Sequence, residues 1–249
     1  MIPLFKSHFS IGKSILKLQS GKSDGSADGI FDIAQEQNLS QVFLVEDSLT
    51  GFLESAKLSQ ELGIQLVFGL RLSCCDFYAE DGAKDCHKVI VFAKDDEGCK
   101  LLNKVYSKTF KDSRSSIELD TLASLWEEDH LKLAIPFYDS FISNNLMSFS
   151  NCAPVFNFTS PTFFIEENHL PFDGLIKNAV VKFCKKNKFK AEKTKSIYYK
   201  DRKDFEAFQT YKCICNRGGW SGKSISLQKP NLDHCGSKEF CIESWKENK

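Results

Sequence analysis

The sequence carries no excess of charge of either sign: its 249 residues include 33 lysines and arginines against 33 aspartates and glutamates. A balanced chain lacks the strong overall field that draws basic proteins onto nucleic acids or membrane surfaces. Arginine is scarce, so lysine supplies most of the positive charge. The arginines stand at positions 71, 114, 202 and 217.

Long apolar runs are missing as well. No stretch approaches the roughly 20 apolar residues of a membrane-spanning helix, and the first residues, MIPLFKSHFS, lack the apolar stretch of a signal peptide. The ten cysteines are therefore expected to be reduced thiols, because disulfides form mainly in secreted proteins. We expect a cytoplasmic protein.

Few histidines stand where they could act in catalysis. Of the five histidines, only His8 falls at the end of a predicted strand, and the others lie in polar loops. No Ser/His/Asp or Cys/His set for nucleophilic catalysis can be assembled from such a pattern. The chain is rich instead in apolar residues: 42% are hydrophobic and 22 are phenylalanine. That composition is enough for the core of one large domain.

The clearest local pattern is a strand, a helix and a second strand. Residues 42–45 are strand formers, residues 51–62 have the apolar spacing of a helix, and residues 66–70 form a second apolar run. Gly63 is placed to end the helix in a left-handed conformation. Such a unit implies parallel strands, whose carboxyl ends carry functional groups in barrel and doubly wound folds. The residues at those ends are Glu46, Asp47 and Arg71.

Apolar runs and helical segments continue to alternate along the chain. The alternation predicts an α/β fold, either a barrel or a doubly wound sheet. The tail, residues 216–249, is polar and is expected to be weakly structured. Further strands are expected at 4–8, 89–92, 131–135, 155–158 and 163–165, and helices at 30–34, 95–108, 118–126, from 174 onward and at 201–214.

The segment GGWSGKS, residues 218–224, looks at first like a phosphate-binding loop. That motif requires a glycine where this chain has Arg217, and a helix should follow the Lys-Ser pair. Residues ISLQKP follow instead, so a simple turn is the favoured interpretation.

Several cysteines near the carboxyl end could bind zinc. Their spacing begins with C-x-C inside a predicted helix rather than with C-x-x-C in a knuckle, so ordinary reduced cysteines are favoured. The residues of this alternative are Cys213, Cys215, Cys235, Cys241 and His234.

A run of lysines spans residues 182–195 and is followed by Tyr198 and Tyr199. Lysines on phosphates with aromatic rings on bases would suit single-stranded nucleic acid. A solvated helix face is the favoured interpretation, because the charge of the whole chain is balanced.

Three stretches together resemble a known family. They are VFLVEDSLTGFLESAKLSQELGIQLVFGLRL, HKVIVFAKDDEGCKLLNKVYS and KSIYYKDRKDFEAFQTYKCICNRGGWSGKS. They are similar to the PHP (polymerase and histidinol phosphatase) domain at the N-terminus of bacterial DNA polymerase III α subunits, and most of all to short free-standing versions in tailed phages. This resemblance implies a bacterium or a phage-infected host cell as the source. The resemblance covers about residues 4–245 and is weakest over 109–172. It implies a distorted (β/α)7 TIM-like barrel over residues 1–214, followed by a short C-terminal extension over 215–249.

The resemblance also implies where metal ligands should stand. Active members of the family hold metal ions with His, Asp and Glu at the strand ends, and the metals activate water for phosphoester hydrolysis. Lysine and arginine cannot supply a lone pair while protonated, so the site is expected to have lost its metals, and Arg71 is expected to pair with Glu46 or Asp47. The residues at the family's ligand positions are Lys6, His8, Val45, Glu46, Asp47, Arg71, Ser196 and Tyr198.

The function implied is that of a pseudoenzyme: a catalytically degenerate PHP-like module in DNA replication, working in trans with a DNA polymerase or a proofreading exonuclease. No cofactor is expected. The alternative is a residual Zn- or Mn-dependent phosphoesterase, of the 3′–5′ exonuclease or pyrophosphatase type, using His8, Glu46 and Asp47. A third possibility is a single-strand binder that uses the face of residues 182–203. Candidate anchors for a protein partner are Phe205, Phe208, Tyr211 and Trp220, because aromatic residues dominate interface hot spots.

Overall fold

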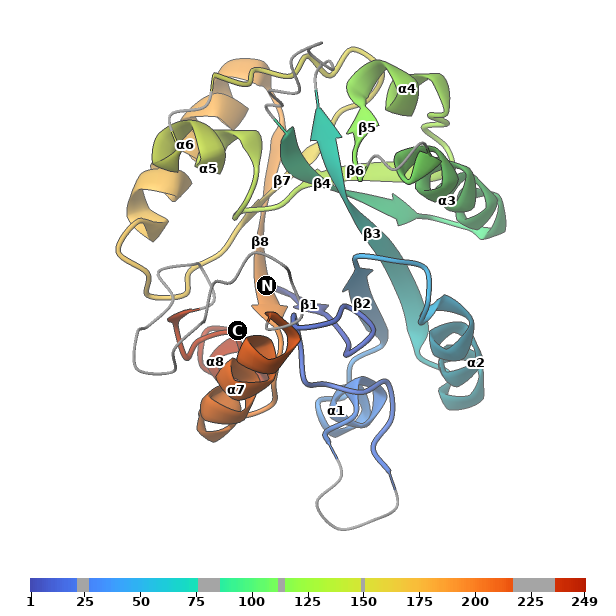
Figure 1. Ribbon diagram of the computed structural model, residues 1–249, viewed down its shortest axis with the longest axis vertical. Coiled ribbons are helices and arrows are strands. Elements are labelled where there is room, and N and C mark those ends of the chain that lie inside the picture. The colour runs from blue at the N-terminus through green and yellow to red at the C-terminus, as the bar shows by residue number, and fades with distance from the viewer. Residues whose placement is uncertain (22–26, 76–85, 112–114, 149–150, 217–235) are drawn as a thin grey trace.

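A closed barrel of seven strands, surrounded by helices, forms the body of the protein (Figure 1). The computed structural model describes residues 1–21, 27–75, 86–111, 115–148, 151–216 and 236–249. The strands are β1 (Ile2–Phe5), β2 (Gln41–Glu46), β3 (Gln65–Cys75), β4 (Cys86–Ala93), β5 (Ile117–Glu118), β6 (Leu131–Ile135), β7 (Thr162–Ile165) and β8 (Lys190–Ile197). The helices are α1 (Ile30–Glu36), α2 (Phe52–Leu62), α3 (Asp96–Thr109), α4 (Leu119–Ser124), α5 (Phe141–Met147), α6 (Asp173–Asn187), α7 (Phe205–Asn216) and α8 (Ile242–Glu247), with a 3-10 turn at Arg202–Asp204.

The strands follow one another around the barrel in chain order, in the sequence β1, β2, β3, β4, β6, β7, β8, and the pairing of β8 with β1 closes it. Neighbouring strands are parallel except at β4, which runs antiparallel to both β3 and β6. The short strand β5 pairs with β3 outside the barrel. The barrel alternative is therefore confirmed over the doubly wound sheet, although the antiparallel β4 departs from a uniform strand–helix repeat.

Local signals in the sequence correspond to observed element ends. Gly63 ends α2 with φ of 65°, the left-handed conformation expected from its position. Asp95 begins α3, and its carboxylate accepts a hydrogen bond from the backbone N–H of Gly98 at 2.8 Å. The strand, helix, strand unit predicted within residues 41–72 is present as β2, α2 and β3, with β2 and β3 parallel and directly paired.

The inside of the barrel is a small apolar cluster separate from the main core. Gly69 of β3 faces into this cluster, where a Cβ atom would lie 2.5 Å from Cε1 of Phe92. That approach is far below van der Waals contact, so the phenylalanine ring occupies the space that a side chain at position 69 would need. The inward-facing members are Leu4, Val45, Ile90, Phe92, Ala134 and Phe164.

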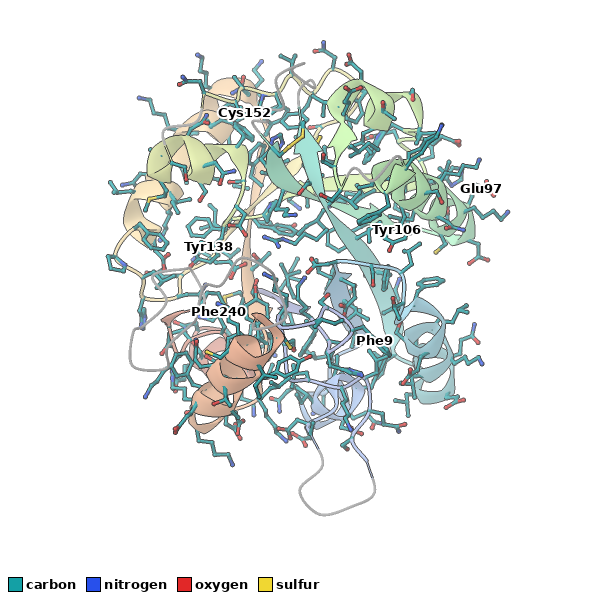
Figure 2. All side chains as sticks on the ribbon, viewed as in Figure 1. Phe9, Glu97, Tyr106, Tyr138, Cys152 and Phe240 are labelled. Carbon is teal, nitrogen blue, oxygen red and sulfur yellow. A yellow bond between two sulfur atoms is a disulfide. The ribbon has the colours of Figure 1, made fainter. Side chains whose placement is uncertain are left out.

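The main core lies between the outer face of the barrel and the surrounding helices (Figure 2). Phenylalanine side chains form a large part of this core. The ring of Phe163 on β7 packs against Phe183 of α6 and against Phe189, with centroids 5.4 and 5.7 Å apart. Phe141 of α5 adds a further ring 5.3 Å from Phe183. The high phenylalanine content thus serves the contact between helices and barrel wall.

Two predicted features of the backbone are wrong. Residues 155–158 form no strand and run as irregular chain. The tail is well structured over residues 236–249: Phe240 is fully buried, and the indole N–H of Trp245 donates to the carbonyl oxygen of Met1 at 3.1 Å. The hydrogen bond between Trp245 and Met1 joins residues 244 positions apart, which a local pattern cannot reveal.

The expectation of reduced cysteines also fails at one pair. Cys75 ends β3 and Cys86 begins β4, the two face each other across the antiparallel ladder with Cα atoms 4.4 Å apart, and they form a disulfide. The remaining described cysteines are free thiols. Among the helices within the described residues, none combines the length and apolar character needed to cross a bilayer.

Candidate functional site

Polar and charged side chains gather at one mouth of the barrel, where the parallel strands have their carboxyl ends. A small cavity of about 40 Å³ opens there, enough for about three water molecules. Because β4 runs in the opposite direction, its first residues reach the same mouth. The polar residues lining the cavity are Lys6, Arg71, Tyr138, Glu166, Ser196 and Tyr198.

Lys6 and Asp47 form an ion pair at this mouth. Lys6 follows β1 and Asp47 follows β2, and the distance from Nζ to Oδ1 is 2.8 Å. The side chain of Lys6 is only 7% exposed, whereas that of Asp47 is 35% exposed. Burial lowers the pKa of Lys6 and the charge of Asp47 opposes that change. Burial works against ionisation of Asp47, but Lys6 and Arg71 outweigh it and lower its pKa.

Glu46 is buried and already fully engaged. One carboxylate oxygen accepts the backbone N–H of Ser7 at 2.7 Å, and the other accepts the hydroxyl of Ser10. The same Ser10 oxygen accepts the backbone N–H of Asp47 at 3.0 Å. Burial raises the pKa of Glu46, against the lowering effect of Lys6 and the serine hydrogen bonds. Glu46 therefore joins the ends of β1 and β2 rather than presenting a free carboxylate.

Arg71 pairs with Asp139, so the prediction that it pairs with Glu46 or Asp47 is wrong. Its Nη2 atom lies 2.6 Å from Oδ2 of Asp139. Burial disfavours the charged guanidinium, but Asp139 and then Asp47 outweigh it and raise the pKa of Arg71. Asp139 adopts a left-handed backbone with φ of 60°, and its carbonyl accepts the N–H of Lys88 at 2.7 Å. Lys6 is closer to Asp47 and takes that carboxylate, which leaves Arg71 to a residue 68 positions away.

Glu166 is a site residue that the sequence analysis missed. It follows β7, is buried, and its carboxylate accepts the backbone N–H of Ser196 at 3.1 Å and the Ser196 hydroxyl at 2.7 Å. It also accepts the side-chain amide of Asn168 at 3.0 Å. A signal was available, because Glu166 is the first polar residue after the predicted strand 163–165. Glu166 holds the end of β8 where β7 no longer pairs with it.

Lys88 was missed as well, and for a different reason. It lies near the start of β4, and its ammonium group donates to the hydroxyl of Ser73 at 2.6 Å. Burial lowers its pKa, with Arg71 adding to that effect. On the sequence alone, functional residues are expected directly after each predicted strand. Lys88 lies near the start of an antiparallel strand, so this expectation does not find it. Three cations, Lys6, Arg71 and Lys88, thus share this end of the barrel.

The remaining residues at the expected metal-ligand positions lie in different places around the barrel mouth. Val45 points into the apolar inside of the barrel, and its aliphatic side chain has no atom that could bind a metal ion. His8 lies beyond the end of β1 beside the ring of Phe9, at a centroid distance of 4.3 Å, and its Nδ1 atom has no hydrogen-bond partner among the described residues. Tyr198 lines the cavity with its ring stacked 5.3 Å from Phe240. His8, Glu46 and Asp47 therefore do not converge as a ready donor set.

Divalent metal ions need several oxygen, nitrogen or sulfur donors converging on one point. In the part of the chain that the structure describes, no three His, Cys, Asp or Glu side chains are arranged to hold a metal ion. At the barrel mouth the buried cations Lys6 and Arg71 would repel one. The residues present there do not fit a metal centre, and the arrangement offers ion pairing rather than water activation.

The alternative zinc site lies partly outside the described residues, because Cys235 and His234 are not among them. Cys241 is buried, and its sulfur accepts the backbone N–H of Ser244 at 3.5 Å at the start of α8. Cys213 is buried in α7 and Cys215 lies against Gly12. The segment 218–224 also lies outside the described residues.

The lysine run does not form one helix face, so that interpretation is wrong. Its first members lie on α6 and its cap, and its last three, Lys190, Lys193 and Lys195, lie on β8. Lys195 is only 1% exposed. The lysines therefore point in different directions from two elements.

The candidate anchors for a protein partner differ in how exposed their side chains are. Phe208 is fully buried, with its ring 5.9 Å from Tyr198, so it has no surface to offer. Phe205 packs against Tyr199, with centroids 6.2 Å apart. Tyr211 is partly exposed near the exposed side chain of Ile214. Trp220 lies outside the described residues.

No protein-family model matches the chain, and no curated protein sequence matches it.

Proposed function

We propose that this chain is a PHP-type barrel without metal-dependent catalysis, acting as a binding module in DNA replication. The observation that carries the proposal is the barrel mouth, where Lys6 pairs with Asp47 and Arg71 pairs with Asp139. In the resembled family this end of the barrel holds the metal ions. The first ion pair joins the neighbouring ends of β1 and β2, and the second joins Arg71 within β3 to Asp139 after β6. In this proposal the two pairs take the place of a metal cluster and stabilise the mouth without creating a nucleophile.

The carboxylates at the mouth support a structural role. Glu46 and Glu166 are both buried, and each accepts a backbone N–H from a strand end, those of Ser7 and Ser196. A carboxylate engaged in this way helps to hold the barrel closed. A residual phosphoesterase would need these groups free to bind metal or to take a proton.

The replication context comes from the resemblance, which extends through α7, where no metal ligand is expected. A module without catalytic groups acts by contact, and the balanced net charge suits a protein partner better than a nucleic-acid one. The partners of this proposal are a DNA polymerase or a proofreading exonuclease. Tyr211 is the best-placed aromatic anchor among the described candidates, because it lies beside the exposed Ile214.

The experiment is copurification from the native or infected cell with identification of the partner. A DNA polymerase or proofreading exonuclease should be recovered above background, and Tyr211→Ala should reduce recovery while the far-ultraviolet circular dichroism stays unchanged. Lys132→Ala on the exposed side of β6 is the matched control. Robust recovery of an unrelated complex, with no replication protein, contradicts the proposed context. Hydrolysis of a phosphodiester on addition of Mn²⁺ or Zn²⁺ contradicts the loss of catalysis.

A further inference from the structure

A second cavity lies beside the ends of β7 and β8, and Glu166 lines both this cavity and the cavity at the mouth. Its volume is about 100 Å³, room for about seven water molecules or more. It is bordered by the ends of β7 and β8, by α6 and by the chain after α8. The charged residues that line it are Glu166, Glu167, Lys177, Lys193 and Lys195.

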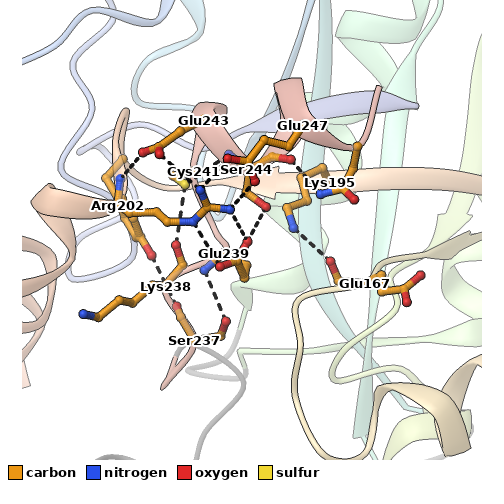
Figure 3. Close-up of polar contacts among 12 residues, drawn as sticks. Glu167, Lys195, Arg202, Ser237, Lys238, Glu239, Cys241, Glu243, Ser244 and Glu247 are labelled. Carbon is orange, nitrogen blue, oxygen red and sulfur yellow. Dashed lines mark hydrogen bonds and ion pairs between the residues drawn. The ribbon is translucent and has the colours of Figure 1, made fainter.

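Lys195 is the most unusual member of this lining. Its side chain is 1% exposed, and its ammonium group donates to the carbonyl oxygen of Glu167 at 2.9 Å (Figure 3). Among the described residues it forms no ion pair. Burial lowers its pKa, and the more distant charge of Glu166 only opposes that change. A buried ammonium group without a paired carboxylate is costly unless another anion compensates it.

The nearby carboxylates are bonded elsewhere. Glu239 and Glu247, on the C-terminal side of Lys195, are held by the guanidinium of Arg202 at 2.9 and 2.5 Å (Figure 3). The carboxylate of Glu166 is turned toward Ser196. These acids stabilise the C-terminal segment and the end of β8, and none of them neutralises Lys195 directly.

The remaining lysines add to the imbalance. Lys177 of α6 pairs with Glu167 at 3.3 Å, and that carboxylate is 70% exposed. Lys193 lines the same cavity, is exposed, and forms no ion pair among the described residues. The lining therefore carries the ammonium groups of Lys177, Lys193 and Lys195 against the carboxylates of Glu166 and Glu167. This excess of positive charge suits a phosphate monoanion.

We propose that this cavity binds a phosphate group, either as inorganic phosphate or as the phosphate of a small organic ester. Lys195 and Lys193 would bind its oxygens, and Lys177 would lie at the rim. Lys193 and Lys195 do not line the cavity at the mouth, although Glu166 borders both cavities. Because β8, α6 and the segment after α8 all border the cavity, a bound phosphate would also join the C-terminal segment to the barrel.

The test is a titration of the protein with inorganic phosphate at constant ionic strength, followed by backbone amide chemical shifts. We expect saturable shifts at the ends of β7 and β8. Lys195→Met should weaken the affinity about tenfold, because it removes a charge-assisted hydrogen bond, and Lys193→Gln should weaken it less. Lys185→Gln, an exposed lysine of α6 that does not line the cavity, should bind as the unchanged protein does.

A parallel titration with glycerol 3-phosphate identifies the source of the ligand, since tighter binding of the ester favours an organic phosphate and tighter binding of phosphate favours the free ion. If Lys195→Met does not fold, Lys193→Gln decides the outcome because its side chain is exposed. The proposal is overturned if the unchanged protein shows no saturable shifts, or if the lysine variants bind phosphate as tightly as Lys185→Gln. Neither result bears on metal binding at the mouth.

Discussion

The ammonium nitrogen of Lys6 lies 2.8 Å from Oδ1 of Asp47, across the carboxyl ends of the neighbouring strands β1 and β2. Lys6 is nearly buried and Asp47 is partly exposed, so the pair stands at the boundary between the barrel core and solvent. In this position Oδ1 of the carboxylate neutralises a lysine. Arg71, within β3, forms a second ion pair with Asp139, which follows β6.

Removing the carboxylate of this pair should destabilise the protein more than removing a surface charge. Asp47→Asn keeps the size of the side chain and leaves the ammonium group of Lys6 buried without a partner. We expect a loss of about 2–4 kcal/mol in the free energy of unfolding, measured by urea denaturation. The double variant Lys6→Met with Asp47→Asn should recover part of that loss.

The matched control for this pair is Glu97→Gln, which breaks an exposed ion pair with Lys100 on α3 and should cost less than about 1 kcal/mol. An equal, small effect of Asp47→Asn and Glu97→Gln would show that the Lys6–Asp47 pair contributes no more than a surface contact.

Reversing the charge at position 71 should be more harmful than deleting it. Arg71→Glu would place a carboxylate beside Asp139 and near Asp47, because both already act on Arg71, and like charges at short range repel. Arg71→Met removes the cation without adding an anion. Thermal denaturation without added metal should rank the unchanged protein above Arg71→Met and Arg71→Met above Arg71→Glu. A more stable Arg71→Glu would contradict the pairing with Asp139.

The pH dependence of stability should report the pairing of Glu239 with Arg202. Hydrogen bonds from Arg202 lower the pKa of Glu239 to about 2, compared with about 4.3 for glutamate in an unfolded chain. A lowered folded pKa contributes stability that is fully present above the unfolded pKa and is lost as pH falls through the folded value.

The stability difference between the unchanged protein and Glu239→Gln should therefore be constant above about pH 5 and shrink between about pH 4.3 and pH 2. The difference between the two proteins is the measured quantity, because it cancels the titration of other carboxylates. A difference that is independent of pH across this window would show that Glu239 is not stabilised by Arg202.

Gly69 offers a test of the apolar cluster inside the barrel. Gly69→Ala places a methyl group against the ring of Phe92 and the side chain of Ile90, and overpacking of this kind costs about 1–3 kcal/mol. Gly174→Ala, in the first turn of α6 with nothing within 4 Å of the added carbon, should be neutral or stabilising. The free energies of unfolding of the two variants, compared by urea denaturation, check the expectation. Equal effects would place Phe92 outside the space beside Gly69.

Short-range features of this fold were predictable from the sequence. The run of strand formers at 42–45, the helix at 51–62 and the left-handed Gly63 all depend on neighbouring residues, and each is observed in place. Glu46 and Asp47 lie at the carboxyl end of β2 as predicted, at the mouth where the ends of parallel strands meet. Arg71 was also expected at a strand end, but β3 continues to Cys75, and Arg71 reaches the mouth from within that strand.

Their partners could not be predicted, because they come from distant parts of the chain. Arg71 pairs with Asp139, which follows β6 after a strand-stopping proline, and Lys195 is buried by a C-terminal segment whose composition is polar. The disulfide between Cys75 and Cys86 follows from the antiparallel direction of β4, which no local pattern signals. Alternation of strands and helices instead suggested a uniform parallel order.

Metal content is the most direct measurement of the state of the barrel mouth. Elemental analysis of the purified protein, with isothermal titration of Mn²⁺ and Zn²⁺, should find less than one tightly bound ion per chain, and a chelator should leave the melting temperature unchanged. The physical reason is that Lys6 and Arg71 occupy the mouth and engage Asp47 and Asp139. Two or more tightly bound metal ions per chain, with a melting temperature that falls on chelation, would contradict the replacement of the metal site by ion pairs.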